Sequence, residues 1–260
     1  MTPGSEFRMS RSRRAVIFTL GSLPLVPARW SSASETVPLR GGVREAYGPR
    51  ITPLPQLQKA PARYPEPRAN DAVARLFYWN EVALNAVALD HTPVTPGQLR
   101  IFGEQFGPTR TSRALAIIHL AILDAVNAIG RHSPCYSRPT EAASNTSVDA
   151  AIAQAAHDTL VALYPSQTAD LGERLAKDLR QIPDSPAKLN GINLGRRAAA
   201  AILALRANDG SQVPEPIINT EFIPSDQPGK WRQDPVSLIP IALGAFWGQV
   251  TPFVIRSAGQ

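Results

Sequence analysis

The sequence predicts an all-α protein, a helical bundle with an irregular Pro-rich N-terminal arm and an irregular C-terminal connection. Three observations predict this class. Apolar residues recur at three- and four-residue spacing through most of residues 70–210. The eight prolines of that region stand only where a helix would begin or end. No run of residues alternates strongly enough to predict a strand.

Composition sets further bounds on the protein. A chain of 260 residues, 43% of them apolar, can bury one sizeable core or at most two small ones. Its single cysteine, Cys135, has no partner for an internal disulfide, and we expect it to be a small buried hydrophobe. Residues 1–68 carry 11 Lys/Arg against 4 Asp/Glu, whereas the remaining residues carry 16 against 17. The basic charge therefore belongs to the leader, and we expect no nucleic-acid partner.

Residues 1–33 are predicted to be a cloning scar followed by an export signal. Residues 1–8 include Gly-Ser-Glu-Phe, which two adjacent cloning sites would encode, so Met9 is the expected natural start. Arg13-Arg14 precede the twelve-residue apolar stretch 15–26, and small residues follow it. The stretch is shorter than the about 20 residues that span a bilayer. We expect export to the periplasm or the medium, with a plain disordered tail as the alternative.

Residues 34–69 are rich in Pro and Arg without hydrophobic periodicity, which predicts an extended arm. The first helix of the bundle is predicted from Asn70, a good N-cap, to Asp90. A short second helix is predicted from Thr95 toward Phe106, because proline at the first helical position loses no hydrogen bond.

The third predicted helix, 111–129, is the most apolar segment of the chain. It has almost no polar face, so we expect it to be buried centrally. Arg113, His119, Asp124 and Asn127 are distributed through it, and a charged residue at mid-bilayer costs about 2.5–3.5 kcal/mol. A soluble core helix is therefore the preferred interpretation, and no membrane span is expected.

Two shorter helices are predicted next. Thr146 and Asp149 have the spacing of a capping box and start a helix that runs to Tyr164, where Pro165 ends it. An amphipathic helix is predicted over 168–181.

The last predicted helix runs from Pro186 to Arg206. Gly191 and Gly195 lie one turn apart in it and weaken its helicity, which indicates that another helix approaches closely there. Residues 211–260 have seven prolines and little periodicity, but too many large apolar side chains for a solvated tail. They are predicted to be an ordered irregular extension of the helical domain 70–210.

The sequence contains few candidates for catalytic or metal-binding residues. The sequence has no glycine-rich phosphate loop, zinc-binding spacing or nucleophile elbow. His119 and Asp124 point about 140° apart on a helix, so they cannot share a metal, and His119 is better explained as a satisfied core histidine. The same interpretation applies to His157 beside Asp158. His91 and His132 fall in predicted loops without a recognisable partner.

Lys230 and Arg232 flank Trp231 and could hold an oxyanion. A turn formed by Pro228-Gly229, with Trp231 anchored in the helical body, explains the same residues and is preferred.

Several runs, in order from Asp71 to Phe253, resemble bacterial relatives of vanadium-dependent haloperoxidases. The runs are Trp79-Asn80, Gly107 to Thr109, Ser112 to Ala116, His119, Asp124 to Ile129, Ala155 to His157, Leu163 to Pro165, Ile182 to Asp184, Leu203 to Ser211, Pro228 to Arg232 and Trp247 to Phe253. The resemblance implies an all-helical enzyme of the superfamily shared with type-2 phosphatidic acid phosphatases. Such enzymes hold vanadate or phosphate in a cage of cations, and the vanadium forms use peroxide to oxidise halide.

The chain departs from this family at the anion site. The family's anion site uses a lysine seven residues before Arg-Pro, a Pro-Ser-Gly-His, and a Ser-Arg followed by histidine. The first two motifs are absent from the sequence. Ser112-Arg113 followed by His119 imitates the third, but Asp124 comes one residue late and the usual glycine is missing. We expect a packing helix instead, with Arg113 near its exposed beginning.

The resemblance thus implies the N-terminal helical half of a haloperoxidase, truncated or split, and inactive alone. Vanadate is expected in the complete enzyme and no cofactor on this chain by itself. The expected partner is a C-terminal catalytic half or a second copy. The alternatives are a non-catalytic interaction or dimerisation module and an acid phosphatase of the same superfamily. Whether the chain is itself an enzyme stays open, with Arg113, His119 and Lys230 as the candidate catalytic residues.

Overall fold

The computed structural model describes residues 42–50, 63–138, 141–257 and 259, and within them the protein is all-helical. The predictions for residues 1–33 and for most of the arm lie outside the described residues. The α-helices are α1 (Gly42–Tyr47), α2 (Ala72–Asp90), α3 (Pro108–Gly130), α4 (Val148–Leu163), α5 (Thr168–Arg180) and α6 (Pro186–Arg206), with the short 3-10 helices η1 (Pro165–Gln167) and η2 (Trp247–Gln249). The described residues contain no strand beyond isolated bridges, so the predicted all-α class is confirmed.

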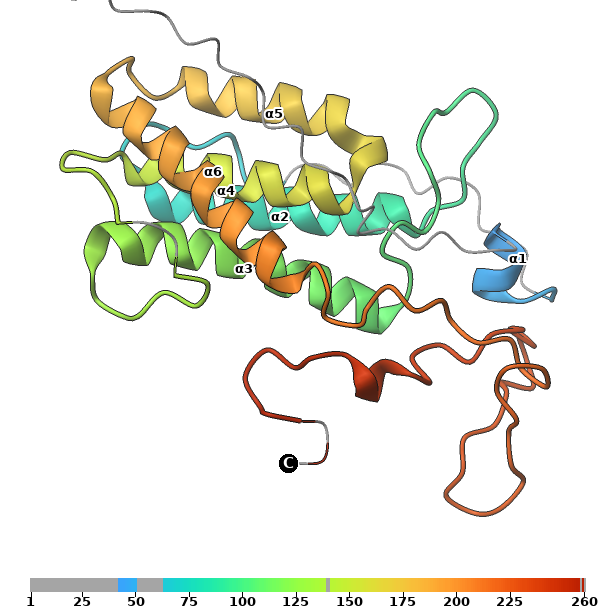
Figure 1. The fold of residues 1–260 in the computed structure, drawn as a ribbon. Coiled ribbons are helices and arrows are strands. Elements are labelled where there is room, and N and C mark those ends of the chain that lie inside the picture. Colours follow the sequence, from blue (N-terminus) through green and yellow to red (C-terminus); the bar gives the residue numbers. More distant parts are fainter. Residues whose placement is uncertain (1–41, 51–62, 139–140, 258, 260) are drawn as a thin grey trace, which may run out of the picture. The chain divides into compact units, whose positions relative to one another are not determined.

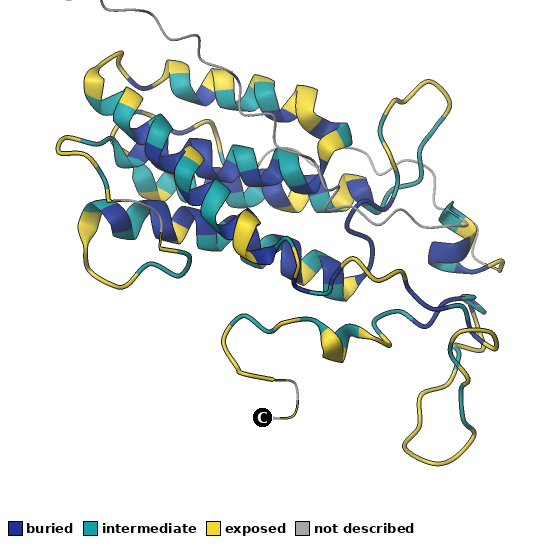
Figure 2. Ribbon diagram, viewed as in Figure 1, coloured by how far each residue is buried: buried dark blue, intermediate teal, exposed yellow. Residues whose placement is uncertain are grey.

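Helix α4 is the centre of the bundle. Residues 149–156 are all buried, and α2, α3, α5 and α6 pack around it (Figure 1). Figure 2 shows buried residues gathered along α4 and on the sides of its neighbours that face it. The core consists mainly of alanines, isoleucines and leucines, with Trp79 fully buried among them.

Helices α4 and α6 approach closely at the two glycines of α6. A Cβ atom on Gly191 would lie 2.4 Å from the carbonyl oxygen of Ser147, and one on Gly195 would lie 2.6 Å from that of Ala151. Both distances are far inside van der Waals contact, so only glycine fits there. The predicted close approach is confirmed.

The helix starts differ from the predictions. The side chain of Asp71, not Asn70, caps α2 by accepting the Ala74 N–H at 3.0 Å. Ser147, not Thr146, caps α4 by accepting the Ala150 N–H. The predicted capping box does not form, because Asp149 is ion-paired with a buried arginine of α2.

No helix forms over residues 95–106, so that prediction is wrong. Apart from a turn in which Gln98 contacts Thr95 and Arg100, the polar groups of this segment bond to partners outside it. Asp90 accepts the N–H groups of Glu104 and Gln105 at 2.7 and 3.0 Å, and Arg100 donates to the carbonyls of Leu89 and Pro93. Helix α3 then starts at Pro108, earlier than predicted, after Gly107 with φ 92°.

Helix α3 is buried on only part of its circumference. It is long and apolar enough to cross a membrane, with a mean hydropathy of 1.5 over its most apolar stretch, and half of that stretch is buried inside the protein. One side packs on α4 and α6, but Leu123 is 46% exposed. The expected central burial is therefore only half realised among the described residues.

The C-terminal segment has little regular structure beyond η2. Two isolated bridges, Ile217 to Ile241 and Ile218 to Phe222, hold its middle together. Trp231 packs edge-on against Phe222, with ring centroids 5.3 Å apart, and is 42% exposed. It is thus anchored within the extension, and the prediction that it anchors in the helical body is wrong.

Candidate functional site

The strongest concentration of buried charge lies where the C-terminal segment meets α3 and α6. It consists of Arg110 and Arg113 on α3, Arg206 on the last turn of α6, Asp209 and Glu215, all buried. We call these five residues the arginine cluster. Cations that converge in this way are the elements of an anion site, so their partners decide whether the cluster is free to hold a ligand.

Arg113 is bound from inside the protein. Its Nε donates to Asp209 Oδ2 at 2.7 Å, and its Nη2 donates to the carbonyl oxygen of Arg206 at 2.9 Å. The side chain is 3% exposed. The expectation that Arg113 lies near an exposed helix beginning is wrong, because α3 starts at Pro108 and the C-terminal segment covers its first turns.

Arg206 joins the end of α6 to the last described residues. Its Nε and Nη2 lie 2.9 and 2.8 Å from Asp209 Oδ2. It also donates to the carbonyl oxygens of Thr251 and Pro252, and its guanidinium lies 4.0 Å from the centroid of the Phe253 ring. One guanidinium thus fixes two separate stretches of irregular chain.

Arg110 completes the cluster one turn before Arg113. It donates to the carbonyl oxygens of Ser211 and Val213, and its Nε lies 3.4 Å from Glu215 Oε1. Glu215 in turn accepts the Gly244 N–H at 2.7 Å. Burial lowers the pKa of Arg110, opposed by the charge of Glu215.

The cluster carries its own anions. Burial alone would raise the pKa of Asp209, but hydrogen bonds from Arg113 and Ser211 outweigh it, so the pKa lies below its usual value. Asp209 is therefore ionised at neutral pH and occupies the space between Arg113 and Arg206. The guanidinium N–H groups donate to Asp209, Glu215 and backbone carbonyls. The cluster is therefore not arranged to bind a tetrahedral oxyanion such as vanadate.

The other two candidates have separate surroundings. The Nε2 atom of His119 lies 3.1 Å from Asn80 Oδ1 on α2, and burial lowers the pKa of this histidine. It is a neutral, half-buried residue at the α2–α3 contact, in line with the core interpretation. Lys230 is exposed in a turn closed by its own N–H to the Gln227 carbonyl. The structure does not bring Arg113, His119 and Lys230 together.

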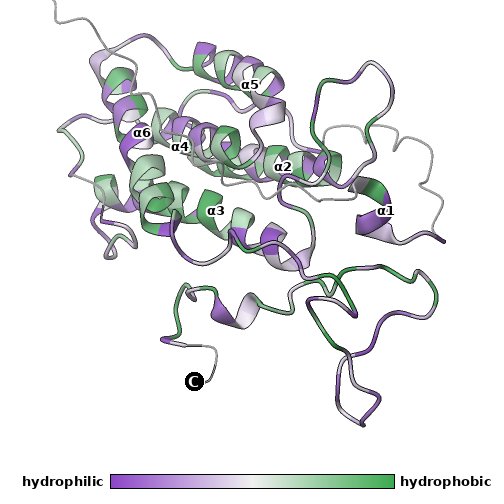
Figure 3. Ribbon diagram, turned by 45° about the vertical axis from the view of Figure 1, so that its right-hand side comes forward, coloured by the Kyte–Doolittle hydropathy of each residue, from purple (hydrophilic) through white to green (hydrophobic). Residues whose placement is uncertain are grey.

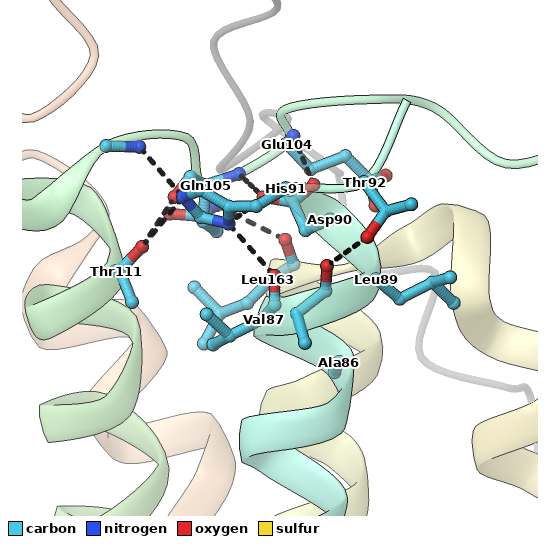
Figure 4. Close-up of polar contacts among 12 residues, drawn as sticks. Ala86, Val87, Leu89, Asp90, His91, Thr92, Glu104, Gln105, Thr111 and Leu163 are labelled. Atoms are coloured by element: carbon cyan, nitrogen blue, oxygen red, sulfur yellow. Dashed lines mark hydrogen bonds and ion pairs between the residues drawn. The ribbon is translucent and has the colours of Figure 1, made fainter. Parts of the chain in front are cut away.

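A second polar cluster closes the C-terminal end of α2 (Figure 4). His91 Nδ1 lies 2.9 Å from the Val87 carbonyl, and its Nε2 lies 3.2 Å from the Gly107 nitrogen, so the ring bridges the end of α2 and the start of α3. The prediction that His91 has no partner is wrong. Glu104, just before α3, accepts both the N–H and the hydroxyl of Ser166.

The sequence analysis did not predict this second cluster, although the position of Asp90 at the end of a predicted helix could have indicated it. A carboxylate at the C-terminus of a helix is repelled by the helix dipole, so it requires partners elsewhere in the fold. Burial raises the pKa of Asp90 and of Glu104. Tyr164 lies nearby, and burial followed by these two carboxylates raises the pKa of its phenol.

A buried ion-pair network ties α2 to α4 and α5. Arg75 is fully buried, and its Nε donates to Asp178 Oδ1 at 2.9 Å. Its Nη1 lies 2.7 Å from Asp149 Oδ1, outside hydrogen-bond geometry, so this contact is an ion pair. Trp79 also donates to Asp178 at 2.8 Å. The ion pairs and hydrogen bonds of this buried network link three helices, which indicates a structural role.

The remaining histidines and the cysteine give no metal or nucleophile site. His157 and Asp158 are paired at 2.7 Å despite their adjacency on α4. A cavity of about 440 Å³ is lined by His132, Cys135 and six neighbours. Cys135 is only half-buried, contrary to expectation, and burial raises its pKa, which disfavours the reactive thiolate. Within the described residues no group of three or more His, Cys, Asp or Glu could hold a metal ion.

Comparison with known proteins gives one match. Residues 65–255 match the family described as the vanadium chloroperoxidase N-terminal domain. No curated protein and no solved structure matches the chain. The match covers all five helices of the bundle and the arginine cluster.

Proposed function

The chain belongs to the family of vanadium chloroperoxidase N-terminal domains, and on this premise we propose that it is the helical scaffold of a vanadium-dependent haloperoxidase. In this proposal it takes part in the oxidation of halide by hydrogen peroxide only together with a catalytic domain that holds the vanadate. We further propose that the protein is exported, on the signal-like pattern before residue 27.

One observation carries the scaffold role. The three buried arginines of the cluster are neutralised by Asp209 and Glu215. An oxyanion could enter only by displacing Asp209, whose lowered pKa keeps it charged. The cluster instead fixes the C-terminal segment on α3 and α6, which shapes one side of the domain.

The test is an assay of the 260-residue chain with orthovanadate, hydrogen peroxide and bromide, with bromination of a diketone followed by absorbance. We expect no rate above that of the reagents without protein. Coexpression with the catalytic domain of a complete family member should produce a vanadate-dependent rate. Turnover by the chain alone, abolished by Arg113→Ala, would contradict the scaffold proposal.

The same cluster bears on the phosphatase alternative. Phosphate and vanadate make similar demands on a cation cage, and Asp209 occupies the cage against both. We therefore expect the chain alone to hydrolyse no phosphate monoester. Release of p-nitrophenol from p-nitrophenyl phosphate above background would favour the phosphatase instead.

A further inference from the structure

The imidazole of His91 connects the end of α2 to the start of α3 through both of its nitrogen atoms (Figure 4). Its Nδ1 lies 2.9 Å from the carbonyl oxygen of Val87, and the Gly107 N–H donates to its Nε2 at 3.2 Å. A carbonyl oxygen only accepts and an N–H only donates, so Nδ1 carries the hydrogen and Nε2 offers the lone pair. The ring therefore makes both contacts only when it is neutral and in the Nδ1–H form.

The backbone of Gly107 depends on this acceptor. Gly107 is buried and immediately precedes α3, with φ 92°. A proton on Nε2 would place two N–H donors face to face and leave the Gly107 N–H buried without its acceptor. Burying an unsatisfied donor costs its full desolvation penalty, so we expect the backbone at Gly107 to move toward water when the ring is protonated.

A protonated ring has a different partner within reach. Thr111 Oγ1, one turn into α3, lies 3.5 Å from Nε2, and its hydroxyl donates to the carbonyl oxygen of Gln105. The hydroxyl oxygen can still accept a hydrogen bond, so a protonated Nε2 can turn from Gly107 to Thr111 while Nδ1 stays on Val87. The ring thus has two arrangements that differ by one proton. Its side chain is 27% exposed, which gives solvent access to it.

Several charged and titratable groups surround the ring. By element they are Tyr47 of α1, Asp90 of α2, Arg100 and Glu104 of the segment between α2 and α3, and Tyr164 after α4. Asp90 Oδ2 lies 3.9 Å from Nδ1, and its charge favours a protonated ring. Asp90 is on the Nδ1 side, so it supplies no acceptor to Nε2, and the competition between Gly107 and Thr111 at Nε2 remains.

The C-terminal segment packs on the backbone that His91 holds. Figure 3 shows this segment passing the start of α3. A Cβ atom on Gly107 would lie 3.3 Å from Leu243 Cδ2, and one on Gly244 would lie 3.2 Å from Thr109 Cγ2. The Gly244 N–H also donates to Glu215 of the arginine cluster. A displacement of Gly107 would therefore disturb the packing of residues 243–244.

We propose that His91 is an acid-sensitive joint between α2 and α3. The neutral ring fixes Gly107, whereas the protonated ring releases it and loosens residues 243–244 while the helices stay folded. Histidine is the side chain that ordinarily changes charge between about pH 5 and 8, so mild acid is enough to operate such a joint. The inference concerns this chain alone and does not depend on the proposed function.

The first measurement locates the hydrogen on the ring. The full chain is labelled with ¹⁵N, and the imidazole nitrogens of His91 are observed by long-range proton–nitrogen correlation NMR at about pH 7.5. We expect a protonated Nδ1 and an unprotonated Nε2. The opposite form, with the hydrogen on Nε2, cannot accept the Gly107 N–H and would overturn the proposal.

The second measurement is amide hydrogen exchange, corrected for the intrinsic dependence of exchange on pH. Between about pH 7.5 and about pH 5, the protection of the Gly107 and Gly244 amides should fall at least tenfold in the wild type, with protection in α4 unchanged. His91→Gln should show no such fall, because the glutamine oxygen can accept the Gly107 N–H at either pH. His132→Gln replaces an exposed histidine outside the joint and should behave like the wild type.

Two results of the exchange experiment would contradict the joint. Equal protection of Gly107 at both pH values in the wild type would show that proton uptake does not release it. The same fall in His91→Gln as in the wild type would assign the change to Asp90 and Glu104 instead. Circular dichroism checks that both variants are folded. If His91→Gln does not fold, the hydrogen position and the protection of Gly107 in the wild type still decide, since either can refute the proposal.

Discussion

Arg113 on α3 and Asp209 beyond the end of α6 form a buried ion pair, with 2.7 Å between Nε and Oδ2. The pair joins positions 96 residues apart, and Arg206 shares the same carboxylate oxygen. Its position explains how an irregular C-terminal segment can be ordered: the segment is held by charge-assisted hydrogen bonds where it lacks secondary structure.

Asp209→Asn should strongly destabilise the protein. The substitution removes the charge of the carboxylate that the buried guanidinium groups of Arg113 and Arg206 share, and loss of one partner of a buried pair costs about 3–5 kcal/mol. Urea unfolding at pH 7 measures the loss. The control is Asp170→Asn, which removes an exposed helical pair with Arg174 worth only about 0.3–0.5 kcal/mol. Equal losses in the two variants would show that the cluster does not stabilise the fold.

Arg206→Lys should release the last described residues while the helices stay folded. Lysine keeps the charge but lacks the planar fork that reaches Asp209, Thr251 and Pro252 together. Hydrogen exchange followed by mass spectrometry should show faster exchange over residues 249–253 and unchanged exchange in α4. Arg196→Lys, on an exposed part of α6, serves as the control. Unchanged exchange at the Thr251 amide in Arg206→Lys would refute the anchoring role.

The bundle could be predicted from sequence because its signals are local. Apolar spacing and proline positions place α2 through α6 within a few residues of their observed bounds. The caps were misplaced by one residue because Asn70-Asp71 and Thr146-Ser147 each offer two adjacent capping residues. The local sequence does not show which of the two residues caps the helix, because tertiary contacts decide it.

The arginine cluster could not be predicted for a different reason. Its pairs join α3 to residues about 90–105 positions later, and no local pattern connects them. The same holds for the segment 95–106, whose Glu104 bonds to Ser166. Where tertiary hydrogen bonds satisfy the backbone, the helix start signal at Thr95-Pro96 is overridden.

Gly195→Ala should destabilise the α4–α6 contact, although alanine is the better helix former. The added Cβ would lie 2.6 Å from the Ala151 carbonyl oxygen and 2.8 Å from the Gln154 Cβ, and overpacking of this kind costs about 1–3 kcal/mol. Gly172→Ala on α5 is the matched control. Its Cβ meets no atom within 4 Å, so the gain in helix propensity of about 1 kcal/mol should stabilise the protein. Thermal unfolding should move in opposite directions for the two variants, and a shift in the same direction would rule out the steric explanation.

Glu104→Gln should flatten the dependence of stability on pH above the usual range of glutamate. Burial raises the pKa of Glu104, so the folded state binds this proton more tightly than the unfolded chain, and stability falls as pH rises through the two pKa values. Glutamine keeps both contacts, since its oxygen can accept the Ser166 N–H and its amide can donate to the Ser166 hydroxyl. Without the ionisation, the variant should lose less stability than the wild type between pH 4.5 and 7.5, the range over which urea midpoints are compared.

Glu173→Gln on the exposed side of α5 is the control and should reproduce the wild-type slope. A Glu104→Gln slope as steep as the wild type would mean that the carboxyl group stays ionised throughout, and the decline would then belong to Asp90, whose pKa burial also raises.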